Sequence, residues 1–175
     1  GKIEAARFAR EKGMPFLGLC LGMHCAILEV ARNVCGLSEA HSMEFDPQTP
    51  QAVIESLPGP KEGEQVLGRG KMRLGSLPCT LLRDSRAYQV YQEDIVRERH
   101  RHGYKFNYSY QEELATAGLF VTGFCHEDQV AEIVELVGHP WYVAVQFHPE
   151  FKSRPNKPHP LFVDFIDALL NTPPL

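Results

Sequence analysis

The run from Pro15 to His24, with the sequence PFLGLCLGMH, constrains this chain more than any other segment. Apolar residues lead into Cys20, a glycine stands two places to either side of it, and a helical pattern follows. This arrangement is typical of a nucleophile elbow, the sharp strand-to-helix turn that presents a catalytic side chain. We expect glycines at positions 18 and 22 because such a turn leaves no room for side chains beside the nucleophile. A packing cysteine in an ordinary strand–turn–helix fits this segment about equally well.

In an elbow, Cys20 lies at the N-terminus of the following helix. The helix dipole and the free backbone N–H groups there favour a thiolate. The same N–H groups can bind an oxyanion, and Leu21, the residue after the nucleophile, would donate one of them. The segment therefore predicts a nucleophilic cysteine.

A second informative segment lies near the other end of the chain. Residues 141–147, WYVAVQF, have the pattern of a buried strand that runs into His148, Pro149 and Glu150. A residue before proline is pushed to extended geometry, in which residues two apart lie on the same side. Glu150 can then reach the imidazole of His148 and fix its tautomer. Together with Cys20, these residues supply the nucleophile, base and orienting carboxylate of acyl transfer.

The two segments resemble the Cys-His-Glu triad of the class I glutamine amidotransferases. Four stretches further resemble the glutaminase domain of the CTP synthases and occur in that family's order. They are SMEFDP at 42–47, KMRLG at 71–75, ERHRHGY at 98–104 and FHPEFKSRP at 147–155. The resemblance implies that residues 1–175 form one glutaminase domain. Its expected fold is α/β and flavodoxin-like, with a mostly parallel central sheet flanked by helices, a β-rich insertion, and one or more N-terminal strands missing.

The same resemblance implies a set of substrate contacts. They are Leu21, Gly22, Met23 and residue 24 after the nucleophile, Glu44 for the α-amino group of glutamine, and residue 103 for its α-carboxylate. His24 stands where the family has glutamine, and it could equally be a partly exposed histidine of the first helical turn. Gly103 stands where the family has a clamping arginine. Arg101, two residues earlier, could substitute for it if both lie on one strand face.

The implied reaction is hydrolysis of glutamine through a cysteine thioester, with ammonia passed to a separate amidoligase domain that converts UTP to CTP. ATP and Mg²⁺ are expected only in that other domain, and this domain is expected to need no cofactor. The parent protein is expected to be a cytoplasmic homotetramer. A second oxyanion donor lies, in the family, in a Gly-Gly-Phe-Gly-type loop upstream of residue 1, so we expect weak or no glutaminase activity from this chain alone.

Two other functions remain open on the sequence. The departures at positions 24 and 103 are compatible with a catalytically impaired module that has an interaction or structural role. A stand-alone cysteine hydrolase acting on γ-glutamyl compounds is the third possibility.

Composition excludes several classes of function. The length of 175 residues suits one domain, and the net charge of −4 argues against general nucleic-acid binding. The five cysteines include no CxxC pair, which favours free thiols in a reducing compartment. No spacing of ligands for a metal site, no phosphate-binding glycine loop, no signal peptide and no membrane-spanning run is present.

Hydrophobic periodicity predicts the secondary structure. The expected helices are 2–11, 23–34, 111–117 and 160–170. The expected strands are 16–19, 52–54, 71–82, 95–107, 119–126, 130–137 and 141–147, and 46–70 is otherwise expected to be loop. The helix 2–11 is expected to be amphipathic, with Ile3, Ala6, Phe8 and Ala9 among charged residues. The helix 160–170 is expected to have Leu161, Phe162, Phe165, Ile166 and Leu169 on one face.

Overall fold

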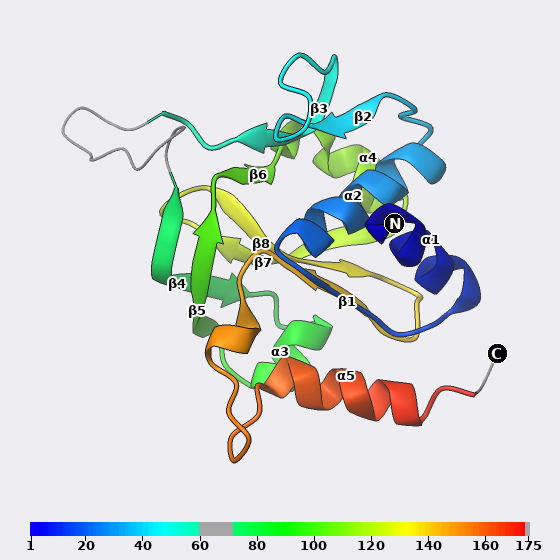
Figure 1. Cartoon of the computed structure of the whole chain (residues 1–175). Helices are drawn as coiled ribbons and strands as arrows, with labels where there is room; N and C mark the ends of the chain where they lie inside the picture. The colour runs from blue at the N-terminus through cyan, green and yellow to red at the C-terminus, as the bar shows by residue number, and fades with distance from the viewer. Residues whose placement is uncertain (60–71, 174–175) are drawn as a thin grey trace.

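The computed structural model describes residues 1–59 and 72–173. A six-stranded sheet with the order β1-β9-β8-β7-β4-β5 forms its centre (Figure 1). Its strands are β1 (Phe16–Leu19), β4 (Arg73–Leu81), β5 (Ile95–His102), β7 (Leu119–Cys125), β8 (Val130–Leu136) and β9 (Tyr142–Val145). A smaller sheet consists of β2 (Ala40–Ser42), β3 (Gln51–Ser56) and β6 (Tyr104–Phe106).

The α/β class is confirmed, but the expectation of a mostly parallel sheet is wrong for the described strands. In the large sheet only β1 and β9 pair in parallel, and the other four pairings are antiparallel. The reason is connectivity: short connections join β7, β8 and β9 in succession, and neighbours joined this way run antiparallel. Among the described strands β1 lies at an edge of the sheet.

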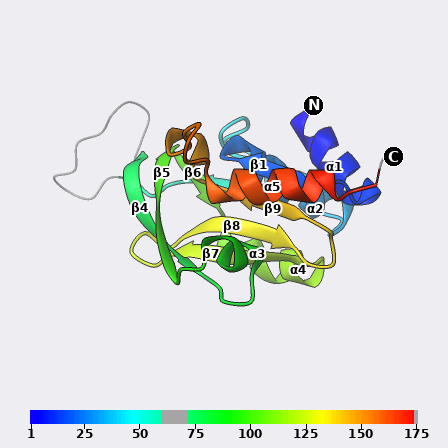
Figure 2. The same ribbon diagram turned by 90° about the horizontal axis from the view of Figure 1, so that it is seen from below.

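Helices cover both faces of the large sheet. In Figures 1 and 2, α1 (Lys2–Lys12) and α2 (Leu21–Asn33) lie on one side, and α3 (Arg86–Tyr91) and α5 (Pro160–Leu170) lie on the other. Two separate clusters of buried apolar residues match these layers: one includes α2 and α4 (Gln111–Thr116), and the other contains Ala87 of α3 and Leu161 of α5. No helix of the described chain has the length and apolarity to cross a bilayer.

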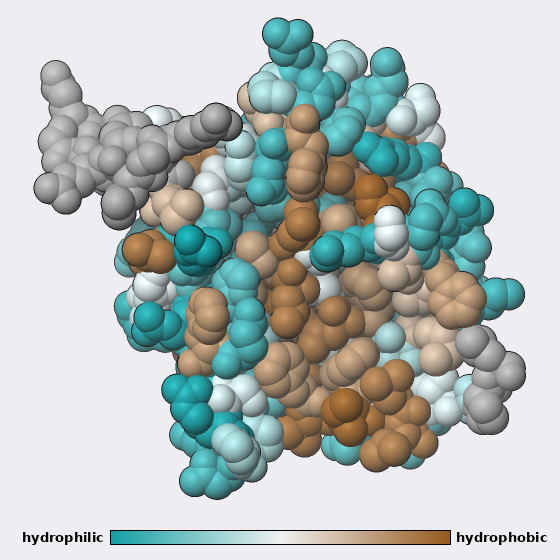
Figure 3. Space-filling model, in the orientation of Figure 1, coloured by the Kyte–Doolittle hydropathy of each residue, from teal (hydrophilic) through white to brown (hydrophobic). Residues whose placement is uncertain are grey.

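The helix faces follow the predicted patterns only in part. Ala6 and Ala9 of α1 are buried, whereas Phe8 is 49% exposed, so the apolar residues of this helix do not all pack inward. On α5 only Leu161 is fully buried, and Ile166 is 51% exposed. Figure 3, in the orientation of Figure 1, shows apolar side chains gathered in the middle of the molecule and over α5.

Most element boundaries agree with the sequence patterns, and three differences have clear causes. The predicted strand 95–107 is divided at Gly103 between the two sheets. The helix α3 was missed because it is short and rich in aromatic and β-branched residues; the Ser85 side chain caps it by accepting from the Tyr88 N–H at 3.0 Å. The strand β2 was missed because it has only three residues. The predicted loop 46–70 and the KMRLG motif lie partly outside the described residues.

The two glycines of the elbow have different surroundings. A Cβ atom added to Gly18 would lie 2.9 Å from the Cβ of Ala144 and 2.9 Å from the backbone carbon and oxygen of Gly22. A Cβ added to Gly22 would meet no atom of the described chain within 4 Å. The prediction that the turn has no room for a side chain is therefore confirmed at Gly18 and is wrong at Gly22.

This contrast gives a matched pair of variants. We expect Gly18→Ala to lower the free energy of unfolding by about 2 kcal/mol, because backbone and a short side chain must shift to admit the methyl group. We expect Gly22→Ala to change it by less than about 1 kcal/mol, since the residue is helical and unobstructed. Urea unfolding followed by circular dichroism measures both, and equal effects would contradict the steric argument.

Candidate functional site

Cys20 forms a tight elbow between β1 and α2. Its backbone has φ 49° and ψ −103°, a left-handed φ that non-glycine residues rarely adopt and that clusters at functional sites. The N–H of Cys20 donates to the carbonyl of Val145 at 2.8 Å, which extends the parallel pairing of β1 and β9 by one residue. The nucleophile elbow predicted from the sequence is therefore present.

The thiol of Cys20 is not pre-activated. Burial raises its pKa above the ordinary value, and the carboxylates of Glu44 and Glu150 add to the rise. The backbone N–H of Leu21 and the side-chain amide of Gln146 act in the opposite direction without outweighing burial. The expected preference for a thiolate at the helix N-terminus is thus overridden, and the thiol needs a base to lose its proton.

His148 and Glu150 form the expected pair. The Nδ1 of His148 lies 2.7 Å from Oε1 of Glu150. The contact is made across a short 3-10 turn over Pro149–Phe151, and not along an extended chain as predicted. The backbone N–H of His148 donates to the carbonyl of Arg99 in β5 at 2.8 Å, and its ring stacks on Phe151. These contacts fix the imidazole from two sides.

The strand register brings the elbow and the histidine to the same edge of the sheet. Leu19, the last residue of β1, pairs with Val145, the last residue of β9. Cys20 follows Leu19 directly, and His148 follows Val145 after two intervening residues; the carboxyl ends of parallel neighbours share one edge. Within the described residues the hydrogen bonds of the Cys20 sulfur include none from His148; contacts between catalytic groups often tighten only when substrate binds.

The structure adds a residue that the sequence reasoning did not single out. Gln146 is fully buried beside the elbow, and its Nε2 lies 3.8 Å from the sulfur of Cys20. Its Oε1 lies 2.8 Å from Nε2 of His24. A polar residue in an otherwise apolar buried strand was the signal available in the sequence. His24 itself is only 2% exposed, so its interpretation as a partly exposed histidine is wrong.

The other predicted substrate residues divide into two groups. Glu44 is close enough to raise the pKa of Cys20, and Leu21 and Gly22 are partly exposed beside the nucleophile. The side chain of Met23 is instead fully buried in the core cluster of α2, so it has no surface for substrate.

The two residues predicted for the α-carboxylate are not equivalent. Arg101 lies on the exposed face of β5, whereas His100 and His102 lie on the buried face, because alternate residues point in opposite directions. Burial lowers the pKa of His102 to about 3, and the nearby Arg73, His24 and His148 contribute to this lowering. Arg101 therefore points away from the buried histidines behind the site. Gly103 lies at the junction of β5 and β6 and has no side chain to offer.

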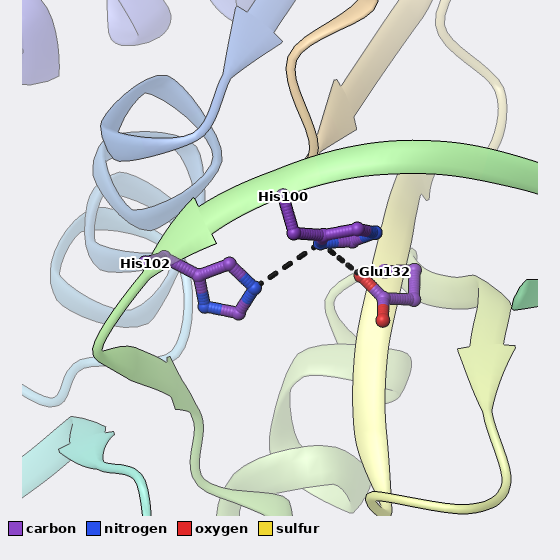
Figure 4. A group of neighbouring side chains, drawn as sticks. All are labelled: His100, His102 and Glu132. Atoms are coloured by element: carbon purple, nitrogen blue, oxygen red, sulfur yellow. Dashed lines mark hydrogen bonds and ion pairs between the residues drawn. The ribbon is translucent and has the colours of Figure 1, made fainter. Parts of the chain in front are cut away.

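A buried polar cluster lies behind the site. Figure 4 shows His100 and His102 of β5 facing Glu132 of β8. Nδ1 of His100 is 3.2 Å from Nε2 of His102 and 3.5 Å from Oε2 of Glu132. These three side chains have the composition and proximity of a metal site.

Arg73 supplies the positive charge of this cluster. Its Nη1 lies 2.5 Å from Oε1 of Glu132 and 3.3 Å from Nε2 of His102, and its Nε donates to Asp128 at 2.8 Å. A divalent ion among these ligand atoms would lie against the guanidinium, which already neutralises the carboxylate. Burial, helped by the charge of Arg73, lowers the pKa of His100 to about 2. In the described structure the carboxylate of Glu132 is therefore paired with Arg73 inside this cluster.

The arrangement as a whole suits attack on a carbonyl carbon. It offers a thiol beside a backbone N–H at a helix N-terminus, a histidine held by a carboxylate, and a second carboxylate, Glu44, near enough for its charge to act on the thiol. The carboxylate can bind an ammonium group, which only donates hydrogen bonds. These are the groups that a cysteine-dependent acyl transfer needs.

Comparison with known proteins agrees with this geometry. The family model described as "Glutamine amidotransferase class-I" matches residues 1–168. The CTP synthase of Moorella thermoacetica is 58% identical over 168 residues, which is 96% of this chain and 31% of that protein. The CTP synthase of Caldanaerobacter subterraneus is 53% identical over 171 residues, covering 98% of this chain and 32% of that protein. The chain thus spans about a third of the length of these relatives.

Solved structures show the same likeness. The glutaminase domain of Trypanosoma brucei CTPS, solved with bound acivicin, superimposes with a TM-score of 0.87 and 33% identity, covering 99% of this chain and 67% of that one. A GMP synthase subunit from Thermoplasma acidophilum shares only the fold, with a TM-score of 0.60 and 12% identity over 95% of this chain and 62% of that one. This chain belongs to the class I glutamine amidotransferases and is similar, over nearly its whole length, to the glutaminase domain of CTP synthase.

Proposed function

We propose that this chain hydrolyses glutamine through a thioester on Cys20 and supplies the ammonia to an amidoligase domain that aminates UTP. The observation that carries the proposal is the shared edge of β1 and β9, where Cys20 follows one strand and His148, bonded to Glu150 at 2.7 Å, follows the other. The amidoligase partner is inferred from the relatives, which are CTP synthases about three times as long as this chain.

In the proposed reaction His148 takes the proton of the Cys20 thiol, whose pKa is raised by burial. The thiolate attacks the carboxamide carbon of glutamine, and the oxyanion is stabilised by the N–H of Leu21. His148 then gives its proton to the departing nitrogen, and ammonia leaves as the thioester forms. Water, deprotonated by His148, attacks the thioester carbon and releases glutamate with the thiol restored.

The role of Glu150 follows from its hydrogen bond to Nδ1 of His148. When Nδ1–H donates to the carboxylate, the lone pair of the neutral ring lies on Nε2, where it can accept the thiol proton. The carboxylate also stabilises the imidazolium that forms. Glu44 would bind the α-amino group of glutamine, and the burial that raises its pKa would then be offset by the ammonium.

Loss of the nucleophile tests this function directly. In the full-length protein we expect Cys20→Ser to abolish CTP formation from UTP, ATP and glutamine, because a serine hydroxyl is a much weaker nucleophile with this base. Formation of CTP from UTP, ATP and added ammonia should remain. The control is Cys25→Ser, a buried neighbour on α2. Equal loss with glutamine and with ammonia would contradict a role confined to glutamine hydrolysis.

The substitution at position 103 gives an independent test of substrate binding. We expect Gly103→Arg to lower the KM for glutamine by roughly 10-fold or more, since a guanidinium can bond a carboxylate in bidentate fashion. The kcat should change little, because the α-carboxylate does not take part in bond making. Glutamate release at varied glutamine concentration measures both constants. Gly103→Ala is the control, and the same KM for both variants would show that this position does not face the α-carboxylate.

A further inference from the structure

His24 lies one helical turn after Cys20 and is turned inward. Its Nε2 is 2.8 Å from Oε1 of Gln146, and its Nδ1 is buried with no hydrogen-bond partner among the described residues. Burial lowers the pKa of His24 to about 4, so the ring is neutral near pH 7 and carries a single N–H. The position of that hydrogen decides how Gln146 is oriented.

The unpartnered Nδ1 selects one of the two arrangements. If Nε2 carries the hydrogen, it donates to Oε1 of Gln146, and only a lone pair on Nδ1 is left unsatisfied. If Nδ1 carries the hydrogen, a buried N–H has no acceptor, and the Gln146 amide must turn over to donate to Nε2. Orphaned buried donors are rarer in proteins than under-satisfied acceptors. The first arrangement is therefore favoured.

In that arrangement the NH₂ group of Gln146 faces the nucleophile. Its Nε2 lies 3.8 Å from the sulfur of Cys20 and can donate to it. The amide cannot shift freely, because the backbone N–H of Gln146 donates to the carbonyl of Glu132 at 2.8 Å and its side chain is fully buried. The sulfur thus receives donors from Leu21 and from Gln146, and both favour its ionised form.

We propose that His24 is a positioning residue that holds the Gln146 carboxamide with its NH₂ group toward Cys20 and thereby stabilises the thiolate. The inference rests on the proposed function and deepens it, because it adds a neutral relay from His24 through Gln146 to the nucleophile. It also gives His24 a role different from the substrate contact implied by the family resemblance. The ionisable neighbours of the relay are Glu44 and Glu150 at the thiol and His102 at His24.

The test uses a reaction that needs no glutamine. In the full-length protein, alkylation of Cys20 by iodoacetamide is followed against pH by mass spectrometry of the peptide that contains it. We expect His24→Phe and Gln146→Met each to raise the apparent pKa of Cys20 by about one unit, which slows alkylation near pH 7 by about 10-fold. The double variant should be no slower than either single variant, since both remove the same donor.

The matched control is Cys25→Ala, the next residue on α2, which is buried and has no hydrogen bond to Gln146 in the described structure; its pH profile should equal that of the unaltered protein. Profiles of folded His24→Phe and Gln146→Met that overlay the unaltered one would overturn the proposal. So would a His24 ring in the unaltered protein that carries its hydrogen on Nδ1, read from ¹⁵N NMR of histidine-labelled protein. If the relay variants behave as expected but glutamine is not hydrolysed, only the proposed function fails.

Discussion

The parallel pairing of β1 with β9 is the constraint on which the site depends. It aligns Leu19 with Val145, and the N–H of Cys20 continues the ladder to the Val145 carbonyl at 2.8 Å. The elbow, the buried amide of Gln146 and the histidine of the HPE segment then follow from chain continuation alone. Because Cys20 is held at φ 49°, this pairing also maintains a backbone conformation that would be unfavourable in a free chain, at a cost on the order of 1–3 kcal/mol.

Behind that edge lies an interior layer of polar groups, which is unusual in a core and therefore has to be satisfied from within. Arg73 is central to it, with bonds to Asp128 and Glu132 and a contact to His102. The histidines in this layer are kept neutral by burial, so the guanidinium is balanced by carboxylates and not opposed by further cations. The layer supports β5 and β8 on the side where His148 bonds the Arg99 carbonyl.

Sequence reasoning recovers what depends on local pattern and misses what depends on distant contact. The strand 16–19 and the helix 160–170 have the predicted bounds because periodicity and a proline or glycine mark their ends. The three residues of the proposed triad were accessible to sequence reasoning because the elbow and the HPE segment are local motifs. The direction of strand pairing could not be predicted in this way, since it depends on how β7, β8 and β9 are connected. The burial of His24 could not be predicted either, because its partner Gln146 is 122 residues away.

The departures from the family pattern fall on two positions that the resemblance assigns to substrate recognition, and the residues proposed to make and break bonds are unchanged. Cys20, His148 and Glu150 are present and positioned at one edge of the sheet, whereas the residues at 24 and 103 differ. The two departures do not have the same consequence. In the proposed function a glycine at 103 removes a group that binds only the α-carboxylate, so we expect its effect in glutamine binding and therefore in KM. In our proposal the histidine at 24 acts on the sulfur through its hydrogen bond to Gln146, so its effect falls on the chemical step. The two departures therefore act on separate steps in the proposal: position 103 on glutamine binding and position 24 on ionisation of the thiol.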